Sequence, residues 1–186
     1  GGFPMDPVPW QQVQSWDCNG CGECCRPYTV CLLWDEWVNI VRTYGFEVTE
    51  PSVDGFYLKK KGPDRRCIFQ YTFGGRWLCA IQSTKPLACK LWPFKILSRP
   101  KYGHQALSSF PYRDRDLYVY ADPFCRGLSY GAPTERLAKK VIPEFIELSR
   151  GLRKDQHYST TQLGPSTSPM FYTARPLYLP YSPRRI

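Results

Sequence analysis

The sequence predicts a small, irregular α+β domain of short strands, hairpins and a few helices. Its 186 residues suit a single domain with a core of its own. Strand-like runs alternate with glycine- and proline-containing turns, and two segments carry apolar residues at helical spacing. No apolar run reaches the roughly 18 residues of a membrane span. The first ten residues do not resemble an intact signal peptide, and we expect a cytoplasmic protein.

In the first half of the chain, residues 1–15 are polar and contain proline, which predicts an extended N-terminal arm. Residues 28–33 resemble a short strand, and residues 34–45 predict a helix that ends at Gly45. Hairpins are expected around the two turn sequences that follow, Gly62-Pro63-Asp64 and Gly74-Gly75. The second hairpin would carry Cys67 near one end and Cys79 near the other, so that two remote thiols could meet.

In the second half, residues 84–96 are broken by proline and predict irregular structure, with strands expected within 104–110 and 116–123. Residues 133–152 form an amphipathic pattern with Thr134 as a helix cap, and Pro143 should kink or divide that helix. The cysteine-containing domain is expected to cover residues 16–154. Residues 155–186, rich in Ser, Thr, Pro and Tyr, predict an extended tail.

Nine cysteines dominate the chemistry that this chain offers. Four of them lie within the eight residues from Cys18 to Cys25, and two of those are adjacent. The odd total and the close spacing argue against a disulfide framework, whereas the C-x2-C-x2-C-C interval is typical of metal ligands. The sequence therefore predicts metal binding by free thiols.

Thiolates are used in fours by both of the metal centres that such a pattern suggests. A structural zinc ion and a 4Fe–4S cluster each take four cysteines, so eight of the nine would fill two sites. Glycines at 20 and 22 suit a loop that wraps one centre, because glycine tolerates positive φ. Cys24 and Cys25 are expected to diverge and serve different centres, unless one of them bridges.

The wider pattern resembles the YkgJ-like CxxCxxCC cysteine-cluster family, whose description is a zinc- or iron-chelating domain. The pattern consists of C-x2-C-G-x-C-C, a cysteine pair, P-x2-C-x2-[aromatic]-P-F and C-x-G. The matching residues are Cys18, Cys21, Gly22, Cys24, Cys25, Cys67, Cys79, Pro86, Cys89, Trp92, Pro93, Phe94, Cys125 and Gly127. Two departures are Lys85, where an arginine is expected, and the less glycine-rich ending "CRGLSYG".

This resemblance implies a set of eight metal ligands and leaves Cys31 outside it, as a buried free thiol. The implied ligands are Cys18, Cys21, Cys24, Cys25, Cys67, Cys79, Cys89 and Cys125. The cofactor is either an iron–sulfur (4Fe–4S) cluster or zinc. C-x2-C-x2-C with a remote cysteine is the ferredoxin-like arrangement, and paired C-x2-C knuckles are the zinc arrangement. Cluster-bearing relatives of the family suggest an accessory electron-transfer or methyl-transfer component as one alternative.

A second alternative is a module that binds RNA or a ribonucleoprotein, with the metal as a structural element. The net charge of +9 and two basic stretches indicate it. Candidate contacts are Lys59, Lys60, Lys61, Arg65, Arg66, Arg175, Arg184 and Arg185. The tail could equally dock on a partner protein through its aromatic residues. No nucleotide-binding motif and no catalytic Cys–His pair stand out, so a binding protein is expected more than an enzyme.

Overall fold

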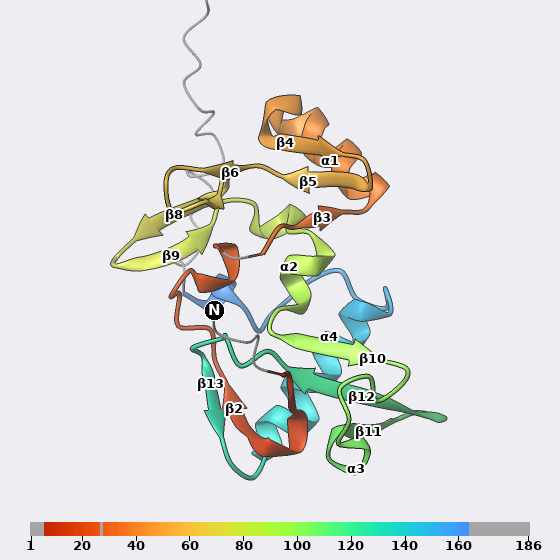
Figure 1. Cartoon of the computed structure of the whole chain (residues 1–186). Coiled ribbons are helices and arrows are strands. Elements are labelled where there is room, and N and C mark those ends of the chain that lie inside the picture. The colour runs from red at the N-terminus through yellow and green to blue at the C-terminus, as the bar shows by residue number, and fades with distance from the viewer. Residues whose placement is uncertain (1–5, 27, 164–186) are drawn as a thin grey trace, which may run out of the picture.

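The computed structural model describes residues 6–26 and 28–163, which form two hydrophobic cores with a layer of cysteine-bearing segments between them (Figure 1). It confirms the predicted α+β class, with short strands in small sheets and a few helices. None of the helices in these ranges has the length and apolar character needed to cross a membrane.

The lower core in Figure 1 is built on a four-stranded antiparallel sheet. Its central strand β12 (Arg115–Ala121) pairs with β1 (Val8–Pro9) and β10 (Phe94–Leu97), and also with β11 (Ser109–Tyr112). A two-stranded sheet of β2 (Val13–Trp16) and β13 (Leu128–Tyr130) completes this half.

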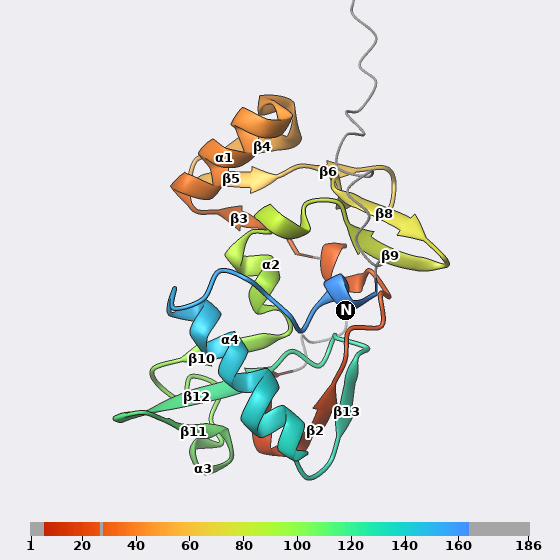
Figure 2. The same cartoon turned by 180° about the vertical axis from the view of Figure 1, so that it is seen from behind.

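One long helical segment covers the sheet of the lower core, as the view from behind shows (Figure 2). It consists of a π-helical turn, Leu137–Val141, followed by α4 (Ile142–Ser149). Thr134 caps it by accepting a hydrogen bond from the Leu137 amide at 3.2 Å. Pro143 lies in the first turn of α4, where the segment changes from π-helical to α-helical; the backbone stays helical at Val141 and Ile142, so the helix is not divided as expected.

The upper core is formed by α1 (Trp34–Tyr44) and a small sheet in the order β3–β5–β4. These strands are β3 (Cys31–Leu32), β4 (Thr49–Ser52) and β5 (Gly55–Leu58). Helix α1 ends before Gly45, as predicted. Its buried residue is Ile40, whereas Trp34 at its first position is exposed.

Two hairpins follow, at the turns that the sequence predicted. The first joins β6 (Lys60–Lys61) to β7 (Arg66–Cys67), and the second joins β8 (Gln70–Phe73) to β9 (Arg76–Cys79). Cys67 therefore ends the first hairpin, whereas it was expected at one end of the second, where Gln70 pairs with Cys79. Between the cores lies α2 (Leu87–Leu91), a short helix where irregular structure was expected (Figure 1). The Glu36 carboxylate accepts hydrogen bonds from the amides of Leu33 and Leu87, at 2.9 Å and 2.7 Å, and so links the start of α1 to α2.

Two further segments differ from expectation. The stretch predicted as an N-terminal arm supplies β1, β2 and the 3-10 turn Trp10–Gln12, because Val13 and Trp16 are apolar enough to join the lower core. Residues 104–110 contain α3 (Gln105–Ser108) before β11 begins. Other 3-10 turns span Glu23–Cys25, Phe46–Val48, Gln82–Thr84 and Thr160–Gln162.

The chain after α4 is held against the domain as far as Leu163. Glu144, which is 2% exposed, accepts hydrogen bonds from the amides of His157 and Tyr158, both at 2.8 Å. Its second oxygen accepts from Arg153 at 2.8 Å. The start of the predicted tail, 155–163, therefore packs on the domain, and its remainder, 164–186, lies outside the described residues.

Candidate metal centre

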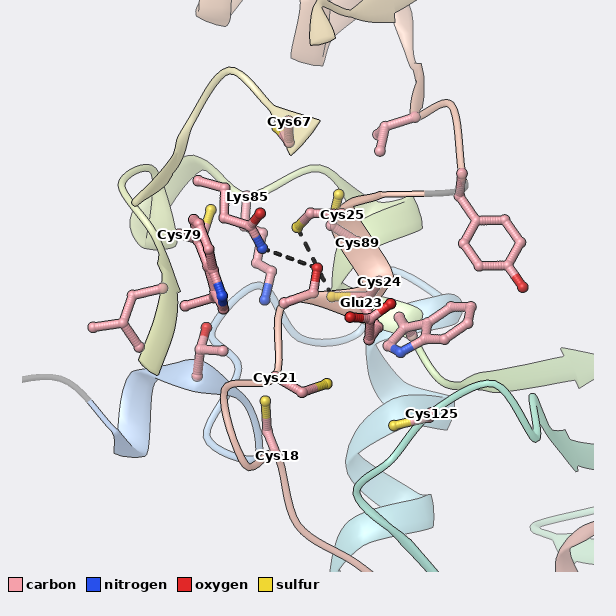
Figure 3. A pocket seen from close by; sticks show the side chains of 18 of the residues that line it. Cys18, Cys21, Glu23, Cys24, Cys25, Cys67, Cys79, Lys85, Cys89 and Cys125 are labelled. Atoms are coloured by element: carbon pink, nitrogen blue, oxygen red, sulfur yellow. Dashed lines mark hydrogen bonds between the residues drawn. The ribbon is translucent and has the colours of Figure 1, made fainter. Parts of the chain in front are cut away.

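One cavity of about 270 Å³ lies between the two cores, and all eight of the predicted ligands line it (Figure 3). They are Cys18, Cys21, Cys24, Cys25, Cys67, Cys79, Cys89 and Cys125. All nine cysteines of the chain are free thiols. Cys31 is the one that does not line this cavity. It is exposed on β3 rather than buried, because its neighbour Leu32 takes the core-facing position of that two-residue strand.

Six of the eight thiols pack against one core or the other, and we group the remaining two, Cys21 and Cys24, with the lower-core pair to give two sets of four. Cys25, Cys67, Cys79 and Cys89 pack against the upper core. Cys18 and Cys125 pack against the lower core, and Cys21 and Cys24 lie near enough to Cys125 to raise the pKa of its thiol through their charge. Figure 3 shows Cys18, Cys21 and Cys125 on one side of the cavity and Cys67, Cys79 and Cys89 on the other. Cys24 and Cys25 lie at the boundary.

The loop from Cys18 to Cys25 depends on two glycines in the left-handed region, Gly20 at φ +69° and Gly22 at φ +74°. Gly22 is also confined by packing. A Cβ atom there would lie 2.6 Å from Cγ of Trp77, closer than real contacts allow. The side-chain amide of Gln70 donates to the Gly22 carbonyl at 3.1 Å. These contacts fix the loop against the second hairpin.

The adjacent thiols of Cys24 and Cys25 are themselves in contact. Their sulfurs are 3.8 Å apart and share a hydrogen bond. That bond lowers the pKa of Cys24 and raises the pKa of Cys25. The two side chains were expected to point apart, and the structure instead brings their sulfurs into contact.

The four cavity-lining cysteines outside the Cys18–Cys25 loop lie on four separate segments of the chain. Cys67 and Cys79 end the strands β7 and β9, and Cys89 lies on α2, where its amide donates to the carbonyl of Pro86 at 3.0 Å. Gly127 explains the C-x-G motif: a Cβ there would lie 2.2 Å from the carbonyl oxygen of Asp17. That close approach brings Cys125 beside Cys18.

Backbone amides support two sulfurs in each set. The N–H groups of Gly20, Phe69, Ile81 and Gly127 hydrogen-bond to cysteines two positions earlier, namely Cys18, Cys67, Cys79 and Cys125. Each of these bonds lowers the pKa of its thiol, because an N–H dipole stabilises a thiolate. The indole of Trp16 adds a donor to Cys125 at 3.3 Å.

Burial opposes ionisation of these thiols. It raises the pKa of Cys18 to about 11, and it also raises the pKa of Cys67, Cys79, Cys89 and Cys125. Lys85 lines the cavity, and its positive charge counters the effect of burial at Cys18, Cys79 and Cys89. A group of buried thiols with a cation beside it suits a metal that binds thiolate and displaces the protons.

The basic turn predicted to contact nucleic acid is used partly within the domain. Lys60 donates to the carbonyl of Cys25 at 2.8 Å, and Lys61 donates to the carbonyl of Gln70 at 2.7 Å. The Arg66 guanidinium lies 3.8 Å from the ring centroid of Trp77 and donates to Gln70. Lys59 and Arg65 are exposed. Arg175, Arg184 and Arg185 lie outside the described residues, and nucleic-acid binding stays a prediction.

The donor set fits zinc or iron, since soft thiolates are the ligands that both prefer. In the orientations that the side chains have, no three His, Cys, Asp or Glu residues within 6–26 and 28–163 form an arrangement that could hold an ion. The thiols face a common cavity without closing on one point. Binding would therefore require side-chain rotations toward the centre of each set.

These features define a cysteine-rich, metal-chelating class of domain. A family model, CxxCxxCC, described as "putative zinc- or iron-chelating domain", matches residues 17–126. The chain belongs to this family. No curated protein and no solved structure matches it. Sequence reasoning pointed to the cysteines, but it gave no role to Trp16, Gln70 or Trp77, which support them from positions without a motif.

Proposed function

We propose that this protein holds two metal centres, each on four cysteine thiolates, between its two cores. The observation that carries the proposal is that all eight thiols line one cavity. One centre would use Cys18, Cys21, Cys24 and Cys125. The other would use Cys25, Cys67, Cys79 and Cys89.

The division into fours rests on packing and on charge. The second set gathers on the upper core, and its members come from four segments that share no sheet, namely a 3-10 turn, β7, β9 and α2. In the first set, Cys18 is influenced by the charges of both Cys24 and Cys125. The charge of Cys24 also acts on Cys79 and Cys89, so its place in the first set rests on the C-x2-C-x2-C spacing. Cys24 and Cys25 belong to different sets, although a bridging thiolate at this pair is compatible with their 3.8 Å separation.

Iron–sulfur clusters are the cofactor that we propose, ahead of zinc. Four sulfurs about 2.3 Å from a zinc ion lie in van der Waals contact with one another and leave little room between them. The cavity of about 270 Å³ offers the volume of several water molecules, since each water occupies about 30 Å³. An iron–sulfur cluster contains iron and sulfide ions between the cysteine sulfurs, and these ions would fill such a space. The first set also has the C-x2-C-x2-C spacing of ferredoxin-like ligands.

When bound, such clusters supply one-electron transfer. The chain's own contribution is to hold the thiolates and offset their charge. Amides of Gly20 and Gly127 support the first set, amides of Phe69 and Ile81 support the second, and the Lys85 ammonium lies beside both. Donors of this kind raise the reduction potential of a bound cluster, because they stabilise its more negative state.

The test is anaerobic purification of the full chain, followed by iron, zinc and acid-labile sulfide analysis and a visible absorption spectrum. Iron with matching sulfide and a broad visible band is the expected result. If the analysis finds zinc and no sulfide, the proposed cofactor is wrong, and the proposal of two four-cysteine centres stands. A chain that retains neither metal, and takes up neither after anaerobic reconstitution, would overturn the proposal.

A further inference from the structure

A row of aromatic rings lies exposed on the upper body, away from the cysteine cavity. Trp34 at the start of α1 is 67% exposed, and Phe46 is 51% exposed. Between them, Trp37 stacks on Phe56 with ring centroids 4.1 Å apart. Trp34 lies 5.0 Å from Trp37, and Phe46 meets Trp37 edge-on at 6.2 Å. The exposed Leu33 extends this surface, which we call the aromatic face.

The packing of the upper core accounts for only part of the aromatic face. Trp37 and Phe56 pack against that core, whereas Leu33, Trp34 and Phe46 are exposed and do not belong to it. Large exposed rings in mutual contact form a contiguous apolar patch, and such patches mark binding surfaces. Trp and Phe are also the side chains that line grooves for proline-rich peptides.

The charge around the aromatic face is opposite to that of the rest of the chain. Residues 28–58 hold five acidic residues and one basic residue, within a protein of net charge +9. Asp35 and Glu47, which directly follow Trp34 and Phe46, are exposed. Exposed acidic residues next in sequence to aromatic rings favour an occupant that carries arginine.

We propose that residues 164–186 of this same chain bind the aromatic face. The segment "GPSTSPMFYTARPLYLPYSPRRI" has five prolines, three arginines and no acidic residue. Prolines favour the polyproline conformation that aromatic surfaces bind at low entropic cost. The positive charge of the arginines complements the five acidic residues within 28–58, and the aromatic residues of the segment can pack on the exposed rings.

The length of the segment permits this contact. Leu163, the last described residue, lies beside Gly20, where a Cβ would be 3.2 Å from the Leu163 side chain. Twenty-three residues follow it. At about 3.1 Å per residue they reach roughly 70 Å. A compact domain of about 160 residues has a radius of gyration near 15 Å, so the segment can reach any point on its surface.

The experiment is hydrogen–deuterium exchange on the full chain, with a synthetic peptide of residues 164–186 as the reference for unprotected exchange. In the wild type we expect the amides of this segment to exchange roughly tenfold more slowly than in the peptide. Trp34→Ala should remove the protection, and so should a triple variant with Arg175→Glu, Arg184→Glu and Arg185→Glu. None of the three changes replaces a residue that forms either hydrophobic core in the described part of the chain.

Phe73→Ala is the matched control, since Phe73 is 49% exposed on β8 and lies outside the aromatic face. It should leave the exchange of the segment unchanged. A second measurement places a photo-crosslinker in the full chain by Tyr178→benzoylphenylalanine, and a monomeric product joined to α1 is expected. Wild-type exchange at the rate of the free peptide would overturn the proposal. A crosslinked dimer would also overturn it, because the aromatic face would then bind the segment of a second copy of the chain. Crosslinks to residues outside α1 would overturn it as well.

Discussion

The indole nitrogen of Trp16 donates a hydrogen bond to the sulfur of Cys125 at 3.3 Å, although the two residues are 109 positions apart in the chain. Trp16 also packs edge-on against Phe94 and Phe145, at 5.7 Å and 5.3 Å between ring centroids. One side chain thus joins the lower core to the candidate metal centre. Folding of that core and placement of Cys125 are coupled through it.

Trp16→Phe should weaken metal binding with little change in the fold, because it keeps an aromatic ring in the core and removes the N–H donor. Loss of a hydrogen bond to a metal ligand typically lowers metal affinity by about tenfold or more. Competition with a chelator would measure it. Trp10→Phe is the matched control, since the Trp10 indole donates to the carbonyl of Ser109, away from the thiols. Equal losses in both variants would contradict the role given to Trp16.

Removing one cysteine from either set should remove one centre and leave the other. We expect Cys125→Ser and Cys89→Ser each to lower the bound metal to about half, and the double variant to abolish binding, since each centre needs four thiolates. Metal analysis of the purified chains gives the result. Cys31→Ser, which changes an exposed thiol outside the cavity, should retain full metal content. Complete loss of metal from either single variant would show that the eight thiols form one coupled centre.

Gly22→Ala should destabilise the loop that carries four of the thiols. The new methyl group would meet Trp77 at 2.6 Å, and the backbone would be strained at φ +74°. Gly74→Ala is the control for backbone strain alone. Gly74 also has a positive φ, of +56°, but nothing lies within 4 Å of its Cβ position. We expect Gly22→Ala to lower the free energy of unfolding by about 1–3 kcal/mol more than Gly74→Ala does. Chemical denaturation measures this, and equal effects would count against the packing argument.

Glu144→Gln should release the segment that follows α4. A neutral amide loses the charged partner of Arg153, and it accepts more weakly from the amides of His157 and Tyr158. We expect a loss of about 2 kcal/mol in the free energy of unfolding. Faster hydrogen exchange at residues 157 and 158 should accompany it. Glu135→Gln is the control, since its ion pair with Lys139 is exposed on both sides and should contribute little. An unchanged stability in Glu144→Gln would refute this anchoring role.

The sequence by itself determined the features that depend on neighbours along the chain. The helix that ends at Gly45, the hairpin at Gly74-Gly75 and the cap of the last helix at Thr134 follow from local conformational preferences. The cysteine spacing likewise identified the family, because ligands within one short loop must keep fixed intervals.

Only the tertiary structure decided which distant residues share a site. It brought eight thiols to one cavity, exposed Cys31 and Trp34, and turned Lys60 and Arg66 toward the carbonyls of the cysteine loop. It also drew Val13 and Trp16, predicted as part of an arm or its edge, into the lower core. A local pattern cannot specify such outcomes, because each depends on a partner that lies tens of residues away and becomes adjacent only when the apolar faces are buried together.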